Sequence, residues 1–264
     1  MSHEEPPPPV VTAPAAASAP RVSPGGAEDK HGAVRDMFGR IAGRYDLMNR
    51  VMTGGLDGRW RSETVLAARV PAGGRVLDVG TGTGDLALEI ARRHPDATVV
   101  GLDYTGPMIA RAPAKALQAG LAGQISWARA DGHTLPFGDA GFDAVTSAFV
   151  LRNFADLAQA YAEMARVTRP GGRVVALEIS PEGHPLWRPL FRLHFEHVVP
   201  VIGRLITGDD RAYRYLPASV AGFLGAEQVA QVMRAAGLVP LPPRRLMLGS
   251  LMIHVGLRPL GTVR

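Results

Sequence analysis

The stretch Arg75–Ala91, "RVLDVGTGTGDLALEIA", decides the fold of this 264-residue chain. It opens with an apolar run typical of a buried strand and ends with apolar residues spaced along one helical face. Between the two lies a turn that carries Gly80, Gly82 and Gly84. Glycines at such a strand-to-helix turn let a ligand approach the backbone closely. The stretch therefore predicts a nucleotide-binding turn after the first strand of an α/β domain.

Strand and helix patterns alternate along the rest of the chain. Further strands are predicted at residues 98–102, 125–128, 144–149, 173–179 and 250–256. Helical patterns lie between them, one near residues 157–167 and a last one near Ala226–Ala236, ending at Gly237. Alternation of this kind predicts a mostly parallel sheet with helices on both faces.

The residue at position 85 restricts the kind of nucleotide. A dinucleotide fingerprint that starts at Gly80 requires glycine at position 85, where this chain has Asp85. The carboxylate of Asp85 would lie at a helix N-terminus, where it repels a pyrophosphate. A Walker loop requires a lysine after its last glycine, and the turn has none. The turn therefore favours a positively charged nucleoside without phosphates, a description that S-adenosylmethionine (SAM) meets.

Acidic residues follow the next two predicted strands. Asp103 ends the second strand, where a carboxylate can accept both ribose hydroxyls of a nucleoside. Asp131 and Gly132 follow the third strand, where a side-chain oxygen and the backbone can bind the amino edge of adenine. A single acid at a strand end is often only a helix cap. The glycine turn and both acids in this order favour an adenosine site.

Composition and charge bear on several other classes of function. The chain has no cysteine, which excludes disulfides and thiolate metal sites. Its net charge of +5 comes mostly from scattered arginines rather than a basic block, so no nucleic-acid partner is predicted. His194 and His197 share a helical pattern, but no third ligand is evident, so no metal site is predicted.

The ends of the chain and one late segment depart from the alternating pattern. Residues 1–30 are rich in proline and alanine, so we predict a disordered tail before one domain at residues 31–264. The N-terminus lacks the features of a signal peptide and no apolar run reaches about 18 residues, which predicts a cytoplasmic protein. Residues 185–223 are predicted to form a lid insertion. Within it, the apolar segment 189–206 carries arginines, which suits transient contact with the inner face of a membrane.

With these residues in place, the chain resembles the SAM-dependent class I methyltransferases. More narrowly, it is similar to the quinone-biosynthesis C-methyltransferases that act on demethylmenaquinol or 2-polyprenyl-6-methoxybenzoquinol. The blocks that carry the resemblance are "FGRIAGRYDLMNRVMTGGLDGRWR" at 38–61, "FVLRNFAD" at 149–156, "RPGGRVVALEIS" at 169–180 and "VVPVIGRLITGDDRAYRYLPASV" at 198–220. A general SAM methyltransferase has no reason to carry these blocks together.

The resemblance implies a fold and a cofactor site. The fold would be the Rossmann-like class I methyltransferase fold, with a mostly parallel seven-stranded sheet. Carried over by position, the SAM contacts would be Gly80, Thr83, Asp103, Asp131, Gly132 and Ala148. The family often has serine at position 148, so the contact of Ala148 would be through its backbone or through packing. Ser147 would face the other way, because adjacent side chains of a strand point to opposite faces.

The resemblance also implies residues for the chemistry. A quinol carbon attacks a methyl group once the neighbouring hydroxyl has lost its proton, which requires a base or a base acting through water. Arg152 would stabilise the resulting phenolate, and Asn153 would hold the ring oxygen. Tyr45 and Asn49 would contact the ring, while Tyr213 and Arg214 would close the pocket. The alternatives are a structural ion pair for Arg152 and ordinary packing for Tyr45.

The favoured function is SAM-dependent C-methylation of a polyprenyl quinol, most simply demethylmenaquinol to menaquinol. The first alternative is the benzoquinol of ubiquinone biosynthesis, because the sequence does not define the shape of the ring pocket. The second is a SAM methyltransferase for another small molecule. A third is a non-catalytic partner of a quinone-biosynthesis complex, against which the intact glycine turn and Asp103 argue.

Overall fold

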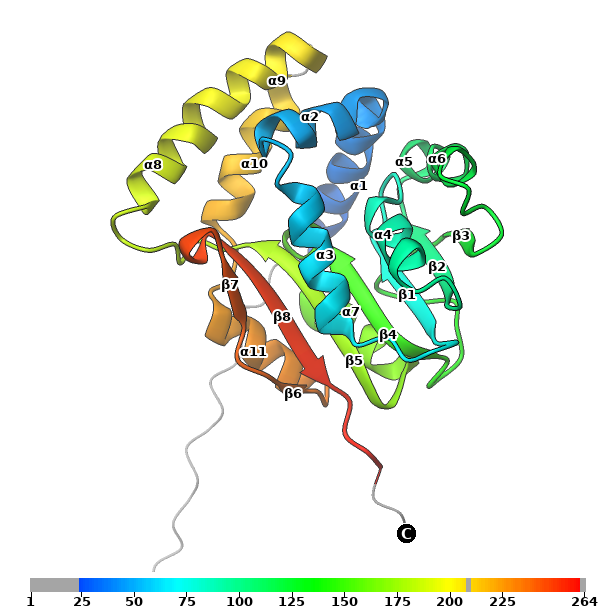
Figure 1. Ribbon diagram of the computed structural model, residues 1–264. Helices are drawn as coiled ribbons and strands as arrows, with labels where there is room; N and C mark the ends of the chain where they lie inside the picture. The colour runs from blue at the N-terminus through cyan, green and yellow to red at the C-terminus, as the bar shows by residue number, and fades with distance from the viewer. Residues whose placement is uncertain (1–23, 208–209, 262–264) are drawn as a thin grey trace, which may run out of the picture.

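The computed structural model describes residues 24–207 and 210–261. Its centre is one sheet whose strands run in the order β3-β2-β1-β4-β5-β8-β6, with β7 also paired to β8 (Figure 1). The strands are β1 Arg75–Val79, β2 Thr98–Asp103, β3 Ile125–Arg129, β4 Phe142–Ala148, β5 Thr168–Ile179, β6 Val239–Pro240, β7 Arg244–Leu246 and β8 Leu251–Leu257. The first five pair in parallel, and β8 is antiparallel to β5. The Rossmann-like α/β prediction is confirmed.

Two details of the sheet differ from the prediction. The sheet has eight strands rather than seven, because β6 and β7 pair with opposite ends of β8 and together fill the last position. Both are too short to leave an alternating pattern in the sequence. The fourth strand was expected to reach Phe149 but ends at Ala148. Phe149 has a positive φ of 60°, which breaks the extended backbone at that point.

Helices cover both faces of the sheet. On one face lie α3 Asp57–Ala68 and α4 Asp85–Arg93, and on the other lie α7 Leu157–Val167 and α11 Ala226–Ala235. Successive side chains of β1 point to opposite faces of the sheet and so belong to two hydrophobic cores. Val76 packs with α3 and α4 on one face, and Leu77 packs with α7 and α11 on the other. The short helices α5 Gly106–Ile109 and α6 Ala112–Gln118 follow β2.

A cover of further helices lies over the carboxyl ends of the parallel strands (Figure 1). It consists of α1 Pro24–Ile41, α2 Tyr45–Met52, α8 Arg188–Leu193, a π-helical segment His194–Val198, α9 Val199–Thr207 and α10 Asp210–Ala221. A separate small core, with Met37, Ile41, Met48 and Val199, joins the N-terminal helices to the inserted ones. Within the described part of the segment 185–223, α9 therefore packs on α2 and α10 packs on α1. That it opens and closes as a lid stays a prediction.

The structure describes only the last residues of the predicted disordered tail, which therefore stays a prediction. Residues 1–23 lie outside the described residues, but residues 24–30 form the first turns of α1. Pro24 stands at the first helical position, where its missing N–H costs nothing. The N-terminal part of α1 is polar and lies beyond the apolar stripe of the helix. Composition alone does not distinguish such a polar helical segment from coil. Within the described part of the chain, no helix has the length and hydropathy needed to cross a membrane.

Candidate active site

The glycine turn between β1 and α4 is tightly built. Gly80 has φ of +69°, and a Cβ there would lie 2.8 Å from the Val150 side chain. Only glycine satisfies both conditions without displacing the neighbouring chain. The turn therefore brings its bare backbone to the carboxyl end of the sheet, as the sequence predicts.

Asp103 fastens this turn to the second strand. Its carboxylate accepts a hydrogen bond from the Gly82 N–H at 2.8 Å and another from the Thr105 N–H at 2.7 Å. Burial raises the pKa of Asp103, although these two backbone donors work in the opposite direction. A carboxylate has further acceptor positions beyond these two bonds, so Asp103 keeps the capacity to accept ribose hydroxyls.

Five of the six predicted cofactor residues meet at one cavity. This cavity has a volume of about 90 Å³, and we call it the middle cavity because it lies in size between two others described below. Its lining includes Gly80, Asp103, Asp131, Gly132 and Ala148. Asp131 is oriented by His133, whose backbone N–H lies 2.9 Å and whose ring Nδ1 lies 2.7 Å from Oδ1. The cavity runs along the ends of four neighbouring strands, as expected for a nucleoside site in a doubly wound sheet.

Gly132 lies against an aromatic wall of the middle cavity. A Cβ at this position would stand 2.7 Å from the Phe154 ring. The ring of Phe154 itself packs edge-on against His133, with centroids 5.2 Å apart. Glycine here allows the aromatic ring to approach the backbone that would bind the adenine.

Thr83, the sixth predicted residue, lies in an adjoining small cavity of about 30 Å³. Asp78 lines the same cavity and is a site residue that the sequence analysis missed. Its buried carboxylate accepts hydrogen bonds from Thr81 Oγ1 at 2.6 Å and Thr146 Oγ1 at 2.9 Å. Burial raises the pKa of Asp78 to about 7, despite these two hydroxyl donors. An acid inside the apolar run "RVLDV" was the available signal.

A large cavity of about 530 Å³ opens beside the two smaller ones. Its walls come from the cover and the strand ends, and they are mostly apolar, with Met37, Phe38, Met48, Trp60, Phe149 and Phe191. Tyr45, the first residue of α2, lines all three cavities and so stands where they meet. Burial raises the pKa of Tyr45, although the Asn49 side chain and Arg152 lower it. A cavity of this kind suits an apolar molecule of drug-like size.

Arg152 lies on the wall of the large cavity, in the 3₁₀ turn that follows β4. One guanidinium nitrogen lies 2.5 Å from Glu178 Oε1 and donates to the Phe149 carbonyl at 2.7 Å. Glu178 is fully buried at 0% exposure. Arg152 therefore combines the two roles that the sequence left as alternatives, since it faces the cavity and also pairs with a buried acid.

Asn153 lies behind a tyrosine of the cover rather than on the large cavity. It lines the middle cavity, and its Oδ1 accepts a hydrogen bond from the Tyr215 hydroxyl at 3.1 Å. Tyr215 lines the large cavity, so it stands between Asn153 and that space. The sequence pointed to Tyr213 and Arg214, whose side chains lie outside the described residues. The motif "AYRYLP" offers two tyrosines without indicating which one faces the site.

The two histidines of the insertion lie apart from any metal-type cluster. The Nε2 atom of His194 lies 3.0 Å from the Met52 carbonyl oxygen, and His194 lines the large cavity. His197 is exposed. The part of the chain that the structure describes holds no group of three or more His, Cys, Asp or Glu side chains suited to a metal ion.

Comparisons with known proteins place this geometry among methyltransferases. The model of the ubiE/COQ5 methyltransferase family matches residues 26–258. The chain is 48% identical over 213 residues to the demethylmenaquinone methyltransferase of Deinococcus radiodurans, covering 81% of this chain and 88% of that protein. It is 47% identical over 223 residues to the protein of the same name from Thermus thermophilus, covering 84% of this chain and 100% of that protein.

A further relative carries a broader name, and a solved structure supports the fold. The chain is 42% identical over 226 residues to the ubiquinone/menaquinone biosynthesis C-methyltransferase of Desulfotalea psychrophila, covering 85% of this chain and 90% of that protein. The structure of a SAM dependent methyltransferase from Aquifex aeolicus superposes with a TM-score of 0.59 at 16% identity, covering 81% of this chain and 97% of that one. At that identity the likeness concerns the fold alone.

Proposed function

Because this chain belongs to the ubiE/COQ5 methyltransferase family, we propose that it transfers a methyl group from SAM to a ring carbon of demethylmenaquinol. The observation that carries the proposal is that a large apolar cavity meets, at Tyr45, two smaller cavities lined by acidic side chains. An apolar ring with a prenyl tail suits the large cavity, and a positively charged nucleoside suits the acidic side chains of the smaller ones. The proteins with 48% and 47% identity are both named for demethylmenaquinone, which favours the naphthoquinol over the benzoquinol.

The residues of the smaller cavities fit SAM. Asp103 would accept the ribose hydroxyls, and Asp131 with the backbone at Gly132 would bind the adenine edge. Asp78 and the bare backbone of the glycine turn would face the methionine end, where a buried carboxylate suits the ligand's positive charge. When bound, SAM supplies a methyl group on a sulfonium, which a nucleophile attacks in line.

The chain's own contribution is to orient the ring, exclude water and stabilise charge. The apolar walls would hold the ring carbon about 3–3.5 Å from the methyl group, which removes much of the entropic barrier. Arg152 lines the same cavity and would stabilise the phenolate as it forms. Tyr45 would contact the ring, and Asn153 would fix the hydroxyl of Tyr215.

The test is methyl transfer in a defined mixture. Purified protein is incubated with methyl-labelled SAM and a chemically reduced, short-chain demethylnaphthoquinol, and the product is identified by mass spectrometry. We expect a monomethylated naphthoquinol, formed with a higher kcat/KM than the product from a matched 6-methoxybenzoquinol. A reversed preference would assign the ubiquinone branch instead. No methylation of either ring by SAM-binding protein would favour another small molecule.

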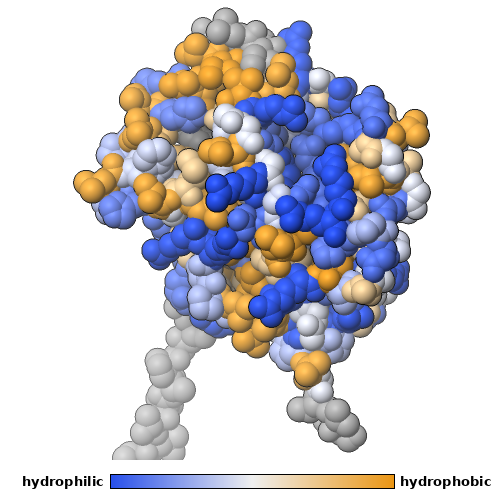
Figure 2. All heavy atoms as spheres, viewed as in Figure 1, coloured by the Kyte–Doolittle hydropathy of each residue, from blue (hydrophilic) through white to orange (hydrophobic). Residues whose placement is uncertain are grey.

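Contact with a membrane surface is a further part of the proposed function, because a polyprenyl tail resides in the bilayer. Hydrophobic residues gather at the end of the molecule formed by α2, α8 and α9 (Figure 2). Leu47, Leu193 and Val201 are 54%, 54% and 60% exposed there. Val51 and Leu190 are also exposed and line the large cavity, so the apolar surface reaches the cavity itself. Such a surface would let the tail pass between membrane and cavity.

Replacing Leu47, Leu193 and Val201 together with serine is expected to weaken vesicle binding by at least about tenfold, because each inserted apolar side chain contributes roughly 1 kcal/mol. Binding is measured by co-sedimentation with phosphatidylcholine–phosphatidylglycerol vesicles. Turnover of a short-chain quinol should be unchanged. The matched control replaces Leu66, Leu117 and Leu260 with serine, since these leucines are exposed outside α2, α8 and α9. If both triple variants lost vesicle binding equally, the membrane contact could not be assigned to α2, α8 and α9.

A further inference from the structure

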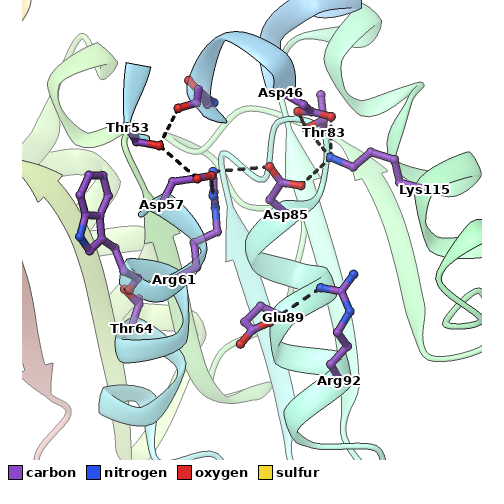
Figure 3. A network of polar contacts seen from close by, with 12 residues as sticks. Asp46, Thr53, Asp57, Arg61, Thr64, Thr83, Asp85, Glu89, Arg92 and Lys115 are labelled. Carbon is purple, nitrogen blue, oxygen red and sulfur yellow. Dashed lines mark hydrogen bonds and ion pairs between the residues drawn. The ribbon is translucent and has the colours of Figure 1, made fainter. Parts of the chain in front are cut away.

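A cluster of charged side chains fastens helix α2 to the glycine turn (Figure 3). Asp46 of α2 accepts a hydrogen bond from Thr83 Oγ1 at 2.5 Å, and its other oxygen lies 2.7 Å from Lys115 Nζ of α6. The same ammonium group reaches Thr83 Oγ1 at 3.1 Å and Asp85 Oδ1 of α4 at 2.5 Å. We refer to Asp46, Thr83, Asp85 and Lys115 as the α2 clamp. It joins three segments that are far apart in the sequence: α2, the glycine turn with the start of α4, and α6.

The far end of α2 is fastened in a similar way. Asp85 also pairs with Arg61 of α3 at 3.5 Å, and Arg61 in turn donates to Asp57. Thr53, which follows α2, donates to the Asn49 carbonyl at 2.7 Å and lies 3.2 Å from Asp57 Oδ1. Figure 3 shows the polar groups running from Thr53 across Asp57, Arg61 and Asp85 to Lys115. Both ends of α2 are thus joined to the elements that hold the cofactor turn.

Neighbouring positive charges keep the Asp85 carboxylate of the α2 clamp ionised. Burial would raise the pKa of Asp85, but Arg61 and Lys115 more than offset it and lower the pKa. Asp85 therefore stays ionised and holds Lys115 in place beneath Asp46. The side chains of Lys115, Asp85 and Asp46 are 24%, 29% and 38% exposed, so water screens these pairs less than it screens pairs on an open surface. A partly buried hydrogen bond to a charged group is stronger than a neutral one.

The position of the clamp gives it a role in the reaction. Thr83 lies in the small cavity expected to hold the methionine end of SAM. Asp46 directly follows Tyr45, which lines all three cavities. A helix held through Asp46 closes the small cavity and fixes Tyr45 between the donor and the ring. Release of Asp46 would open the cofactor site without unfolding the sheet.

We propose that Asp46 is a positioning residue, which through Lys115 and Thr83 holds α2 closed over the cofactor turn and so sets how long SAM and its demethylated product stay bound. The proposal rests on the proposed function only in taking SAM as the ligand. It does not depend on which quinol is methylated. Asp46 itself touches neither substrate; it acts through the placement of Tyr45 and the closure of the small cavity.

The test is the dissociation rate of labelled SAM, chased with unlabelled SAM in the absence of quinol. Asp46→Asn is expected to raise this rate about tenfold and to raise the KM for SAM. Asp36→Asn is the matched control, since it removes an exposed carboxylate of α1 that pairs with the adjacent Arg35. It should leave the rate unchanged. Asp46→Glu keeps the charge on a longer side chain and should recover part of the slow dissociation.

A double-variant cycle separates the clamp from a general loss of stability. In a Lys115→Met background, Asp46→Asn should raise the dissociation rate by less than about a further twofold, because the charged partner of the carboxylate is already gone and only the hydrogen bond from Thr83 remains. An unchanged dissociation rate in Asp46→Asn would overturn the proposal, as would an equal effect with and without Lys115. Slow SAM dissociation that depends on Asp46, in a protein that methylates neither quinol, would support the clamp and contradict the quinol assignment. The two proposals are therefore tested separately.

Discussion

Replacing Arg152 with alanine is expected to lower kcat by about 10²-fold while SAM affinity barely changes. Arg152 lines the large cavity, so in the proposed reaction its charge would act on the ring oxygen rather than on the nucleoside. Its contribution would grow as the phenolate develops and would therefore be measured in kcat. Arg152→Lys should restore only part of the turnover, because a point charge does not reproduce the planar guanidinium that bridges Glu178 and Phe149. Labelled methyl transfer and calorimetric SAM binding measure the two quantities.

The buried partner of Arg152 calls for a second variant. Arg152→Ala leaves Glu178 buried without its counter-charge, which costs about 3–5 kcal/mol of unfolding free energy. Arg152→Met combined with Glu178→Gln removes both charges and should recover most of that stability in urea unfolding. It should not recover turnover. Turnover near that of the unmodified protein in the double variant would reduce Arg152 to a structural role, and a parallel loss of SAM affinity would place it in the cofactor site.

Replacing Asp103 with alanine is expected to weaken SAM binding by about tenfold to a hundredfold, because a charge-assisted bond to the ribose contributes roughly 1.5–3 kcal/mol. The carboxylate also holds the N–H groups of Gly82 and Thr105, so part of the loss would come from a looser glycine turn. Asp103→Asn, which keeps an acceptor of similar shape, should lose less than alanine. Calorimetric titration gives the affinities.

Asp96 provides a control for the general effect of removing an acid that holds a backbone N–H. Asp96 is an exposed acid that accepts a hydrogen bond from the Gly73 N–H at 2.7 Å, away from the three cavities. Asp96→Ala should leave SAM affinity unchanged. If folded Asp103→Ala protein bound SAM with full affinity, Asp103 would have no part in holding the ribose.

The meeting of the candidate cofactor residues at one cavity could be predicted from the sequence for a physical reason. Parallel strands place their carboxyl ends at one edge of a sheet, so residues at or just after the ends of successive strands meet there whatever the details of packing. Asp103 and Ala148 end their strands, Gly80 and Asp131 follow theirs, and all four line one cavity. Asp78 stands one residue before the end of β1, where its apolar neighbours made it resemble a core position.

The other half of the site depends on how the cover packs on the sheet. The cover uses helices from both ends of the chain, and no local pattern indicates which of their faces turn inward. The sequence therefore predicted Arg152 as a site residue but not its partner Glu178, which lies 26 residues away on the next strand. It predicted Asn153 but not the Tyr215 hydroxyl that donates a hydrogen bond to it from 62 residues away.

The sequence by itself determined the order of strands and helices, the glycine turn and the acids beside it, because these depend on periodicity and on backbone conformation along a few residues. The tertiary structure alone decided the large cavity, the buried pair of Arg152 and Glu178, and the contact of Asp46 with Lys115 across 69 residues. Such contacts depend on the angles at which separate elements pack. Differences of an ångström in that packing make or break a hydrogen bond, and nothing in the local sequence encodes them.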